Sequence, residues 1–216
     1  MQIISDFVKE FLYQIIFTAI LSSGFFAVYY RKLRLMADFK ALGICRIYKC
    51  GNDIKSTKKH MSKSKQIMQI SYLPYQFIYE YRLILEKALS NGCAIKLLMC
   101  EPESELLKEA VQMENGDENK NPDKFESLIK MLQSMKMSST GTGTIEVRTF
   151  NAEIRNPVTI YSDKSDNLRS FLTVSIPPKR SRDCCMIEYD TQGSKDIITY
   201  FNTIWNRHNG NVKLKI

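Results

Sequence analysis

A strand, a helix and a strand within residues 66–100 constrain the fold of this chain more than any other feature. Residues 66–73 and 94–100 are short apolar runs typical of buried strands. Between them, apolar residues at helical spacing over 77–90 predict a helix, and Asn91-Gly92 predicts its end, because glycine adopts the left-handed backbone of a helix terminus without strain. Such a unit places its two strands parallel. We therefore expect an α/β fold.

The ends of these two strands are the predicted position of a ligand site. Ligands of open α/β sheets bind beyond the carboxyl ends of the strands. The residues at those ends are Ser71 and Tyr72 after the first strand and Glu101 and Ser104 after the second. Ser104 is also placed to cap a short helix over 103–113.

The second half of the chain predicts a mixed sheet. Asn121-Pro122 is typical of a helix start, and apolar residues continue its stripe to Met135. A Gly-x-Gly segment at 141–143 precedes a strand, so we interpret it as a flexible connector rather than a phosphate loop. The further predicted elements are strands at 144–150, 157–161, 168–176 and 184–189, a helix from 193 to 205, and a tail at 209–216 that is frayed or a short edge strand.

A charge-free stretch near the start predicts a membrane anchor. Residues 11–30 contain no charged side chain, and as a helix they would span about 30 Å, the thickness of a bilayer core. Arg31-Lys32-Leu33-Arg34 follows, which places the rest of the chain in the cytoplasm. A buried core helix is the alternative. We therefore expect a single-pass protein of the inner (cytoplasmic) membrane, with an anchor at 1–36, a basic juxtamembrane linker at 37–65, a cytoplasmic α/β domain at 66–208 and a tail at 209–216.

The positive charge of the chain is concentrated beside this stretch. Residues 31–65 contain eleven Lys or Arg and two Asp, whereas residues 66–216 contain nineteen side chains of each sign. This division argues against a protein whose whole surface binds nucleic acid. The basic segment is either attracted to anionic inner-leaflet lipids or a solvated loop, and contact with a phosphate-bearing ligand is a third interpretation.

Several kinds of chemistry are excluded or disfavoured. The six cysteines form no Cys-x-x-Cys pair and the chain has only two histidines, His60 and His208, which argues against a zinc site. We expect the cysteines to be reduced thiols. No Gly-x-Ser-x-Gly, P-loop or His-Glu-x-x-His pattern occurs. We expect no cofactor.

The order of elements over residues 64–208 resembles the phospholipase D-like domain of many bacterial proteins. The resemblance rests on the strand ending Ile70-Ser71-Tyr72, the segment 91–104, the strand 145–151 and the closing helix 200–205. Active members of that family carry His-x-Lys followed by an Asp, with the histidine as nucleophile. Here Asn156 and Val158 stand at the His and Lys positions, and only Asp163 fits. The resemblance therefore implies a mixed-sheet sandwich that binds rather than cleaves.

The first functional hypothesis is a membrane-anchored sensor. Its cytoplasmic domain would recognise a phosphate-bearing small molecule, such as a nucleotide, or a protein partner, and would signal to the anchor, with homo-oligomerisation as one route. By architectural analogy, this would suit a bacterial antiviral membrane effector. Cations in a predicted turn could pair with phosphate. The candidate ligand residues are Ser71, Tyr72, Glu101, Ser104, Asn151, Arg155, Lys179, Arg180 and Arg182.

The alternative hypothesis is a membrane-tethered phosphodiesterase or nuclease that uses carboxylates and a metal. It requires Glu101, Glu103, Asp163 or Asp183 to cluster. Acids more than about 8 Å apart cannot share one metal, whose oxygen ligands lie at about 2.0–2.6 Å. A scaffold that holds a partner at the membrane is a third option.

Overall fold

The computed structural model describes residues 28–49, 55–113, 120–152, 156–174 and 183–216. Compactness divides the chain into two units, Met1–Leu42 and Gly43–Ile216. The described part of the first unit is a helix over residues 28–41, most of whose side chains are exposed. The second unit is an α/β domain.

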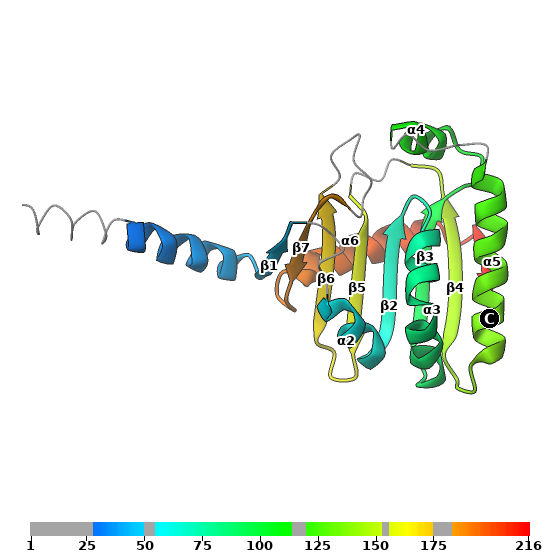
Figure 1. Cartoon of the computed structure of the whole chain (residues 1–216), viewed down its shortest axis with the longest axis horizontal. Coiled ribbons are helices and arrows are strands. Elements are labelled where there is room, and N and C mark those ends of the chain that lie inside the picture. The colour runs from blue at the N-terminus through cyan, green and yellow to red at the C-terminus, as the bar shows by residue number, and fades with distance from the viewer. Residues whose placement is uncertain (1–27, 50–54, 114–119, 153–155, 175–182) are drawn as a thin grey trace, which may run out of the picture. The chain divides into compact units, whose positions relative to one another are not determined.

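A mixed sheet forms the centre of the α/β domain (Figure 1). Its strand order is β1-β7-β6-β5-β2-β3-β4-β8. The strands β2, β3 and β4 run parallel, and the other neighbours pair antiparallel. The prediction of a mixed sheet built on a parallel βαβ unit is thus confirmed. The strands are β1 Ile44–Tyr48, β2 Ser64–Ser71, β3 Ala94–Cys100, β4 Thr144–Phe150, β5 Val158–Asp163, β6 Leu168–Val174, β7 Cys185–Tyr189 and β8 Val212–Lys215.

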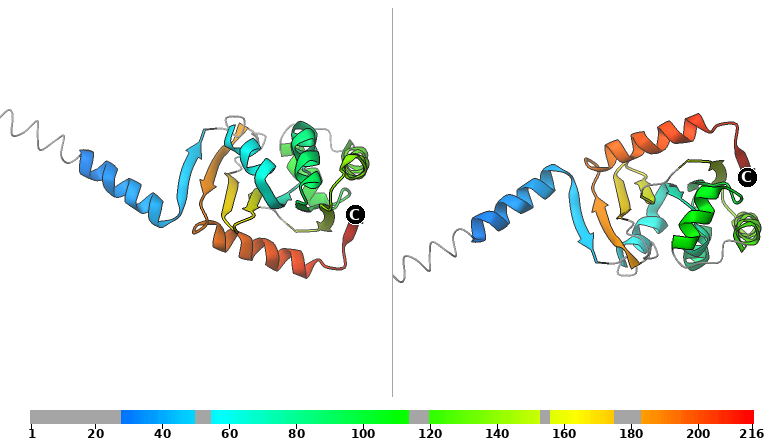
Figure 2. Two further views of the ribbon diagram at one scale, coloured as in Figure 1. Left: turned by 90° about the horizontal axis from the view of Figure 1, so that it is seen from below. Right: turned by 90° about the horizontal axis from the view of Figure 1, so that it is seen from above.

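Helices lie on both faces of the sheet (Figure 2). One face is covered by α2 (Lys55–Lys63), α3 (Tyr75–Ser90) and α5 (Asn121–Ser138), and the other by α6 (Ser194–Arg207). The short helix α4 (Glu105–Met113) lies beyond the end of β3 (Figure 1). Helices on both faces explain why β2 and β3 are apolar on both sides, since neither face meets water.

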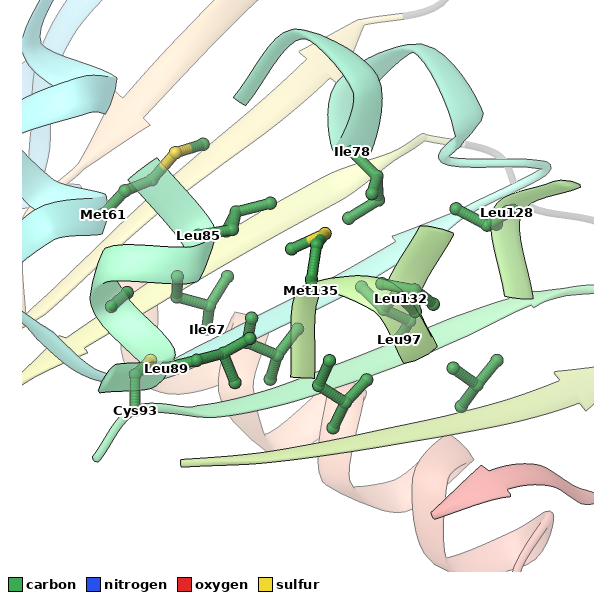
Figure 3. Close-up of a cluster of buried hydrophobic side chains, with 14 of the residues drawn as sticks. Met61, Ile67, Ile78, Leu85, Leu89, Cys93, Leu97, Leu128, Leu132 and Met135 are labelled. Carbon is green, nitrogen blue, oxygen red and sulfur yellow. The ribbon is translucent and has the colours of Figure 1, made fainter. Parts of the chain in front are cut away.

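Successive residues of each strand point to opposite faces of the sheet and so enter two separate cores. On the α3 side, Ile67 and Leu97 pack with leucines of α3 and α5 (Figure 3). On the α6 side, Met68 and Leu98 pack with Phe201. The apolar stripes predicted for the helices at 77–90 and 121–135 contribute these buried residues: Leu85, Ala88, Leu89, Leu128, Leu132 and Met135.

The Gly-x-Gly connector is tightly packed, so its interpretation as a flexible segment is wrong. A Cβ atom at Gly143 would lie 2.4 Å from the carbonyl oxygen of Leu89 and 2.6 Å from that of Cys93. Lys136 Nζ donates to the carbonyl oxygen of Gly143 at 2.6 Å. These contacts join the carboxyl-terminal end of α5 to the corresponding end of α3.

The predicted membrane anchor requires correction. Within the described parts of the chain, no helix is both long enough and apolar enough to cross a bilayer. Residues 11–27 of the predicted span lie outside the described residues, and only its last three begin the helix over 28–41. That helix contains Arg31, Lys32 and Arg34, and central cations are costly in a bilayer. The transmembrane helix, the lipid bilayer as partner and the inner-membrane location are therefore not retained.

Two elements of the α/β domain lie within the segment 37–65, which the sequence predicted to be a linker. The strand β1 pairs with β7 at one edge of the sheet. The helix α2 leads directly into β2 and packs on the same face as α3. At the opposite edge, the predicted tail contains the short edge strand β8, which pairs with β4.

Candidate functional site

The carboxyl ends of β2, β3 and β4 meet at one edge of the sheet, as the βαβ pattern predicts. The N–H of Cys100 donates to the carbonyl oxygen of Tyr72 at 3.1 Å, and the N–H of Glu101 donates to that of Phe150 at 3.2 Å. Ser71 is the register partner of Met99. The carboxyl-end edge, as we name this region, comprises Ser71, Tyr72, Glu101, Ser104, Thr149 and Asn151.

The structure thus brings together five of the predicted ligand residues and adds Thr149. The Thr149 hydroxyl donates to Glu101 Oε1 at 3.3 Å. Ser104 caps α4, because its Oγ accepts the Leu107 N–H at 3.3 Å. The other four predicted ligand residues, Arg155, Lys179, Arg180 and Arg182, lie outside the described residues.

Within the described residues, four buried side-chain polar atoms have no hydrogen-bond partner. They are the Ser71 hydroxyl oxygen, the Gln69 side-chain oxygen and both amide atoms of Asn121. Asn121 is 1% exposed and Ser71 8%. Ser71 and Gln69 share a face of β2, because they are two residues apart. A buried polar group left unpaired costs about 1–3 kcal/mol, so such groups call for an explanation.

Asn121 lies at the level of the carboxyl-end edge, because α5 runs the full height of the sheet (Figure 1). The carboxyl-terminal end of α5 is held against α3 through Gly143. The helix has 18 residues, about 27 Å at 1.5 Å per residue. Its first residue therefore reaches the level at which β3 and β4 end (Figure 1). Sequence reasoning used Asn121 only as a helix-start signal and missed this placement.

The described part of the edge lacks an activated nucleophile. Val158, at the position of the family's lysine, is 4% exposed and packs in the α6-side core. Burial raises the pKa of Cys100 to about 12, so its thiol is protonated at neutral pH and unreactive. Among the described residues, the Ser71 hydroxyl has no base within hydrogen-bond reach, and a serine nucleophile needs one.

The one histidine near this edge was not placed by sequence reasoning. His208 follows α6, and its ring lies 6.0 Å from that of Phe150, the last residue of β4. Its Nδ1 is 3.5 Å from Asn211 Nδ2. In the described residues no carboxylate forms an ion pair with His208, so the structure shows no acid that orients it as a base.

Two carboxylates of the metal-dependent alternative, Glu101 and Asp163, are far apart. Asp163 is the register partner of Ser64, the first residue of β2, whereas Glu101 lies beyond Ser71, the last. Seven steps along β2 separate these ends by about 23 Å. In the described residues, which include all four proposed acids, no three His, Cys, Asp or Glu side chains could hold one metal ion.

A second polar cluster lies beneath α2, away from the carboxyl-end edge. His60 Nε2 is 3.8 Å from Glu188 Oε1, and the Tyr48 hydroxyl donates to Glu188 Oε2 at 2.6 Å. The His60 ring stacks on Tyr161, with 6.3 Å between centroids. Burial lowers the pKa of His60 below 6.5, and Arg169 and Lys59 act in the same direction, whereas Glu188 and Asp163 oppose it.

This lowered pKa predicts a loss of stability in mild acid. As the pH falls below about 6.5, the unfolded chain takes up a proton on His60 before the folded chain does, so the free energy of unfolding decreases. Above that pH His60 is neutral in both states and contributes no slope. We expect His60→Gln to make the urea-unfolding free energy less dependent on pH between about 7.5 and 5.5. If the unfolding free energy changed equally with pH in the wild-type protein and in His60→Gln, this prediction would be contradicted.

Comparison with known proteins gives two distant structural similarities. No family model and no curated protein matches the chain. The chain is similar to the solved structure of TrmBL2, an archaeal chromatin protein described as showing a novel mode of DNA binding. The identity is 14% and the TM-score is 0.47, and the match covers 88% of this chain and 65% of that chain. This chain therefore spans less than two thirds of TrmBL2. It is also similar to NucT from Helicobacter pylori, with 10% identity and a TM-score of 0.44 over 77% of this chain and 96% of that chain.

These similarities assign neither a family nor a function to the chain, because both TM-scores lie below 0.5. The mixed α/β sheet that the sequence resemblance implies is present. Membership of the phospholipase D-like family stays a prediction.

Proposed function

We propose that the α/β domain binds a small polar ligand at the carboxyl-end edge and does not cleave it, and that the ligand is a nucleotide. The observation that carries this proposal is the set of buried, unpartnered polar atoms on Ser71, Gln69 and Asn121. Buried polar groups are nearly always paired, with protein groups or with an ordered water or ion, and a ligand that supplies the missing hydrogen bonds would remove the cost of leaving these atoms unpaired.

The side chains at the carboxyl-end edge suit the sugar and the base of a nucleotide better than its phosphate. Hydroxyl, amide and carboxylate side chains pair well with ribose hydroxyls and base edges, whereas the carboxylate of Glu101 would repel a phosphate. A phosphate group would therefore need other partners, and we keep for it the hypothesis of the sequence analysis that Lys179, Arg180 and Arg182 pair with phosphate. The buried Val158 at the lysine position and the protonated Cys100 support binding without cleavage, as does the lack, among the described residues, of a carboxylate paired with His208.

Ligand-dependent melting of the full chain tests this proposal. We expect one member of a panel of linear and cyclic nucleotides to stabilise the protein by about 2.7 kcal/mol at a hundredfold excess over its Kd, and mass spectrometry should recover that compound intact. Hydrolysis of the compound, or the absence of a shift with every nucleotide, would overturn the proposal. A protein ligand would then become the leading candidate.

Substitution of Ser71 gives a sharper test, because binding and stability should move in opposite directions. Ser71→Ala should weaken binding about tenfold while leaving the free energy of unfolding equal or about 1 kcal/mol higher, since an unpaired buried hydroxyl is removed. The matched control is Ser170→Ala. Ser170 is also buried, but its hydroxyl lies 2.8 Å from that of Ser194, so the change should cost about 1 kcal/mol and leave binding intact. Destabilisation by Ser71→Ala would contradict the proposal.

A further inference from the structure

The helix α2 carries exposed cations and no acidic residue. Lys58, Lys59 and Lys63 are exposed, and α2 contains neither Asp nor Glu. Lys59 and Lys63 are one turn apart, a spacing at which like charges destabilise a helix. In the described residues, no carboxylate lies within ion-pair distance of these three lysines. Within the described residues, no acidic side chain therefore balances the positive charge of α2.

Packing nevertheless holds α2 in one orientation. A helix of nine residues is too short to be stable alone. Met61 is fully buried in the α3-side core, Thr57 is 6% exposed, and His60 stacks on Tyr161. Because these side chains face the sheet, the three lysines face solvent.

Cations from two strands extend this charge beside α2. Arg46 is the register partner of Glu188, so both lie on the face of the sheet that α2 covers. Arg169 is the register partner of Tyr161, on which the His60 ring stacks, so Arg169 lies on the same face. The α2 surface, as we name it, comprises Arg46, Lys58, Lys59, Lys63 and Arg169.

Three described carboxylates near the α2 surface already have other partners. Glu188 is buried and accepts the Tyr48 hydroxyl. Asp163 accepts hydrogen bonds from the backbone of Ser165 and Asn167 in the β5–β6 turn. Asp166 pairs with Lys65. None of these acids is paired with a lysine of α2, so the surface is complementary to an anionic partner.

We propose that the α2 surface binds the phosphate backbone of a nucleic acid, at a site separate from the carboxyl-end edge. Lysines one turn apart stand about 5–6 Å from each other at Cβ, so each can reach a different phosphate of one strand. Lysine is a point charge without the fork geometry that reads bases, and contacts of this kind position a partner without specifying its sequence.

The two sites lie at opposite ends of β2. The helix α2 ends where β2 begins, at Ser64, whereas Ser71 of the carboxyl-end edge is its last residue. These ends are about 23 Å apart at about 3.3 Å per residue. A single nucleotide at Ser71 therefore does not reach the α2 lysines, and either proposal can fail alone.

Fluorescence anisotropy with a labelled duplex DNA of about two helical turns tests the α2 surface in the full chain. We expect Lys58→Glu together with Lys59→Glu to weaken binding at least tenfold at low salt. The slope of log K against log salt concentration should become shallower by about one for each phosphate that the variant no longer neutralises. Because a charge reversal could disturb α2, the double alanine variant at the same positions should show the same order of effects with a smaller decrease in affinity.

The matched control reverses two lysines elsewhere on the domain. Lys195 lies on α6, on the other face of the sheet, and Lys213 lies on β8, at the edge opposite β1; both are exposed. Reversing both changes the net charge by the same amount and should change binding less than threefold. Equal weakening by the control would overturn the proposal in favour of a net-charge effect. Failure of the wild-type chain to bind the duplex while it binds phosphatidylserine vesicles would overturn it in favour of a lipid surface.

Discussion

Replacing Gly143 by alanine should lower the free energy of unfolding by about 2–3 kcal/mol. The added Cβ atom would lie 2.4 Å from the carbonyl oxygen of Leu89 and 2.6 Å from that of Cys93. Both are backbone atoms at the junction of α3 and β3, so neither can rotate away as the end of a side chain could. Inserting a carbon into such a site forces backbone shifts, which cost about 1–3 kcal/mol and sometimes more. Urea unfolding followed by circular dichroism measures the decrease.

Gly210 provides the matched control for this substitution. A Cβ atom at Gly210 would meet nothing within 4 Å, so Gly210→Ala should change the free energy of unfolding by no more than about 0.5 kcal/mol. If Gly143→Ala were equally neutral, the connector after α5 would be able to move. The placement of Asn121 at the carboxyl-end edge would then lose its support, because it depends on the anchoring of the other end of α5.

Local signals were sufficient to predict the centre of the fold. The βαβ unit depends on apolar strands, an amphipathic helix and a glycine stop, and Gly92 indeed has a φ of +85° at the end of α3. Ser104 caps α4 as predicted. Such features depend on neighbours within one or two turns of chain, which sequence reasoning can read directly.

Tertiary contacts account for what the sequence analysis missed. The lysine-rich segment that forms α2 has almost no apolar pattern, and its helix is held by Met61 and by rings at Tyr161 and Phe171 about a hundred residues away. The sequence predicts a flexible connector at Gly143 because glycine permits many conformations. Its close approach to Leu89 depends on where α3 ends, which a linear pattern does not show.

The residues of the candidate site also differ in whether local sequence signals predict them. Strand ends are visible in the sequence, so Ser71, Tyr72 and Glu101 could be predicted from the rule for parallel sheets. The buried amide of Asn121 could not be predicted, because a helix-start asparagine ordinarily faces solvent. Whether its polar atoms have partners depends on the packing of α5 against the sheet.

A second large effect is expected at Arg148, which is 7% exposed on the α6 side of β4. Its Nε and Nη2 donate to Glu146 Oε1 at 2.8 and 2.5 Å, and its Nη1 donates to the carbonyl oxygen of Trp205 at 2.6 Å. The guanidinium carbon also lies 4.0 Å from the centroid of the Trp205 ring. Arg148→Ala should lower the free energy of unfolding by about 3–5 kcal/mol, because it leaves a mostly buried carboxylate and a carbonyl group unpaired.

Lys96 is the matched cation for this test, since it is the register partner of Glu146 and its Nζ lies 5.6 Å from the centroid of the same Trp205 ring. It makes the ring contact without the buried hydrogen bonds, so Lys96→Ala should cost less than about 1 kcal/mol by urea unfolding.

Replacing Glu146 by leucine in the Arg148→Met background should recover much of the stability, because a buried ion pair exchanged for apolar side chains is often neutral. If Arg148→Ala cost no more than Lys96→Ala, the unpaired groups would be reaching water. The anchoring of α6 on β4 would then depend on the Trp205 and Phe201 rings, which stack 5.5 Å apart, rather than on the arginine.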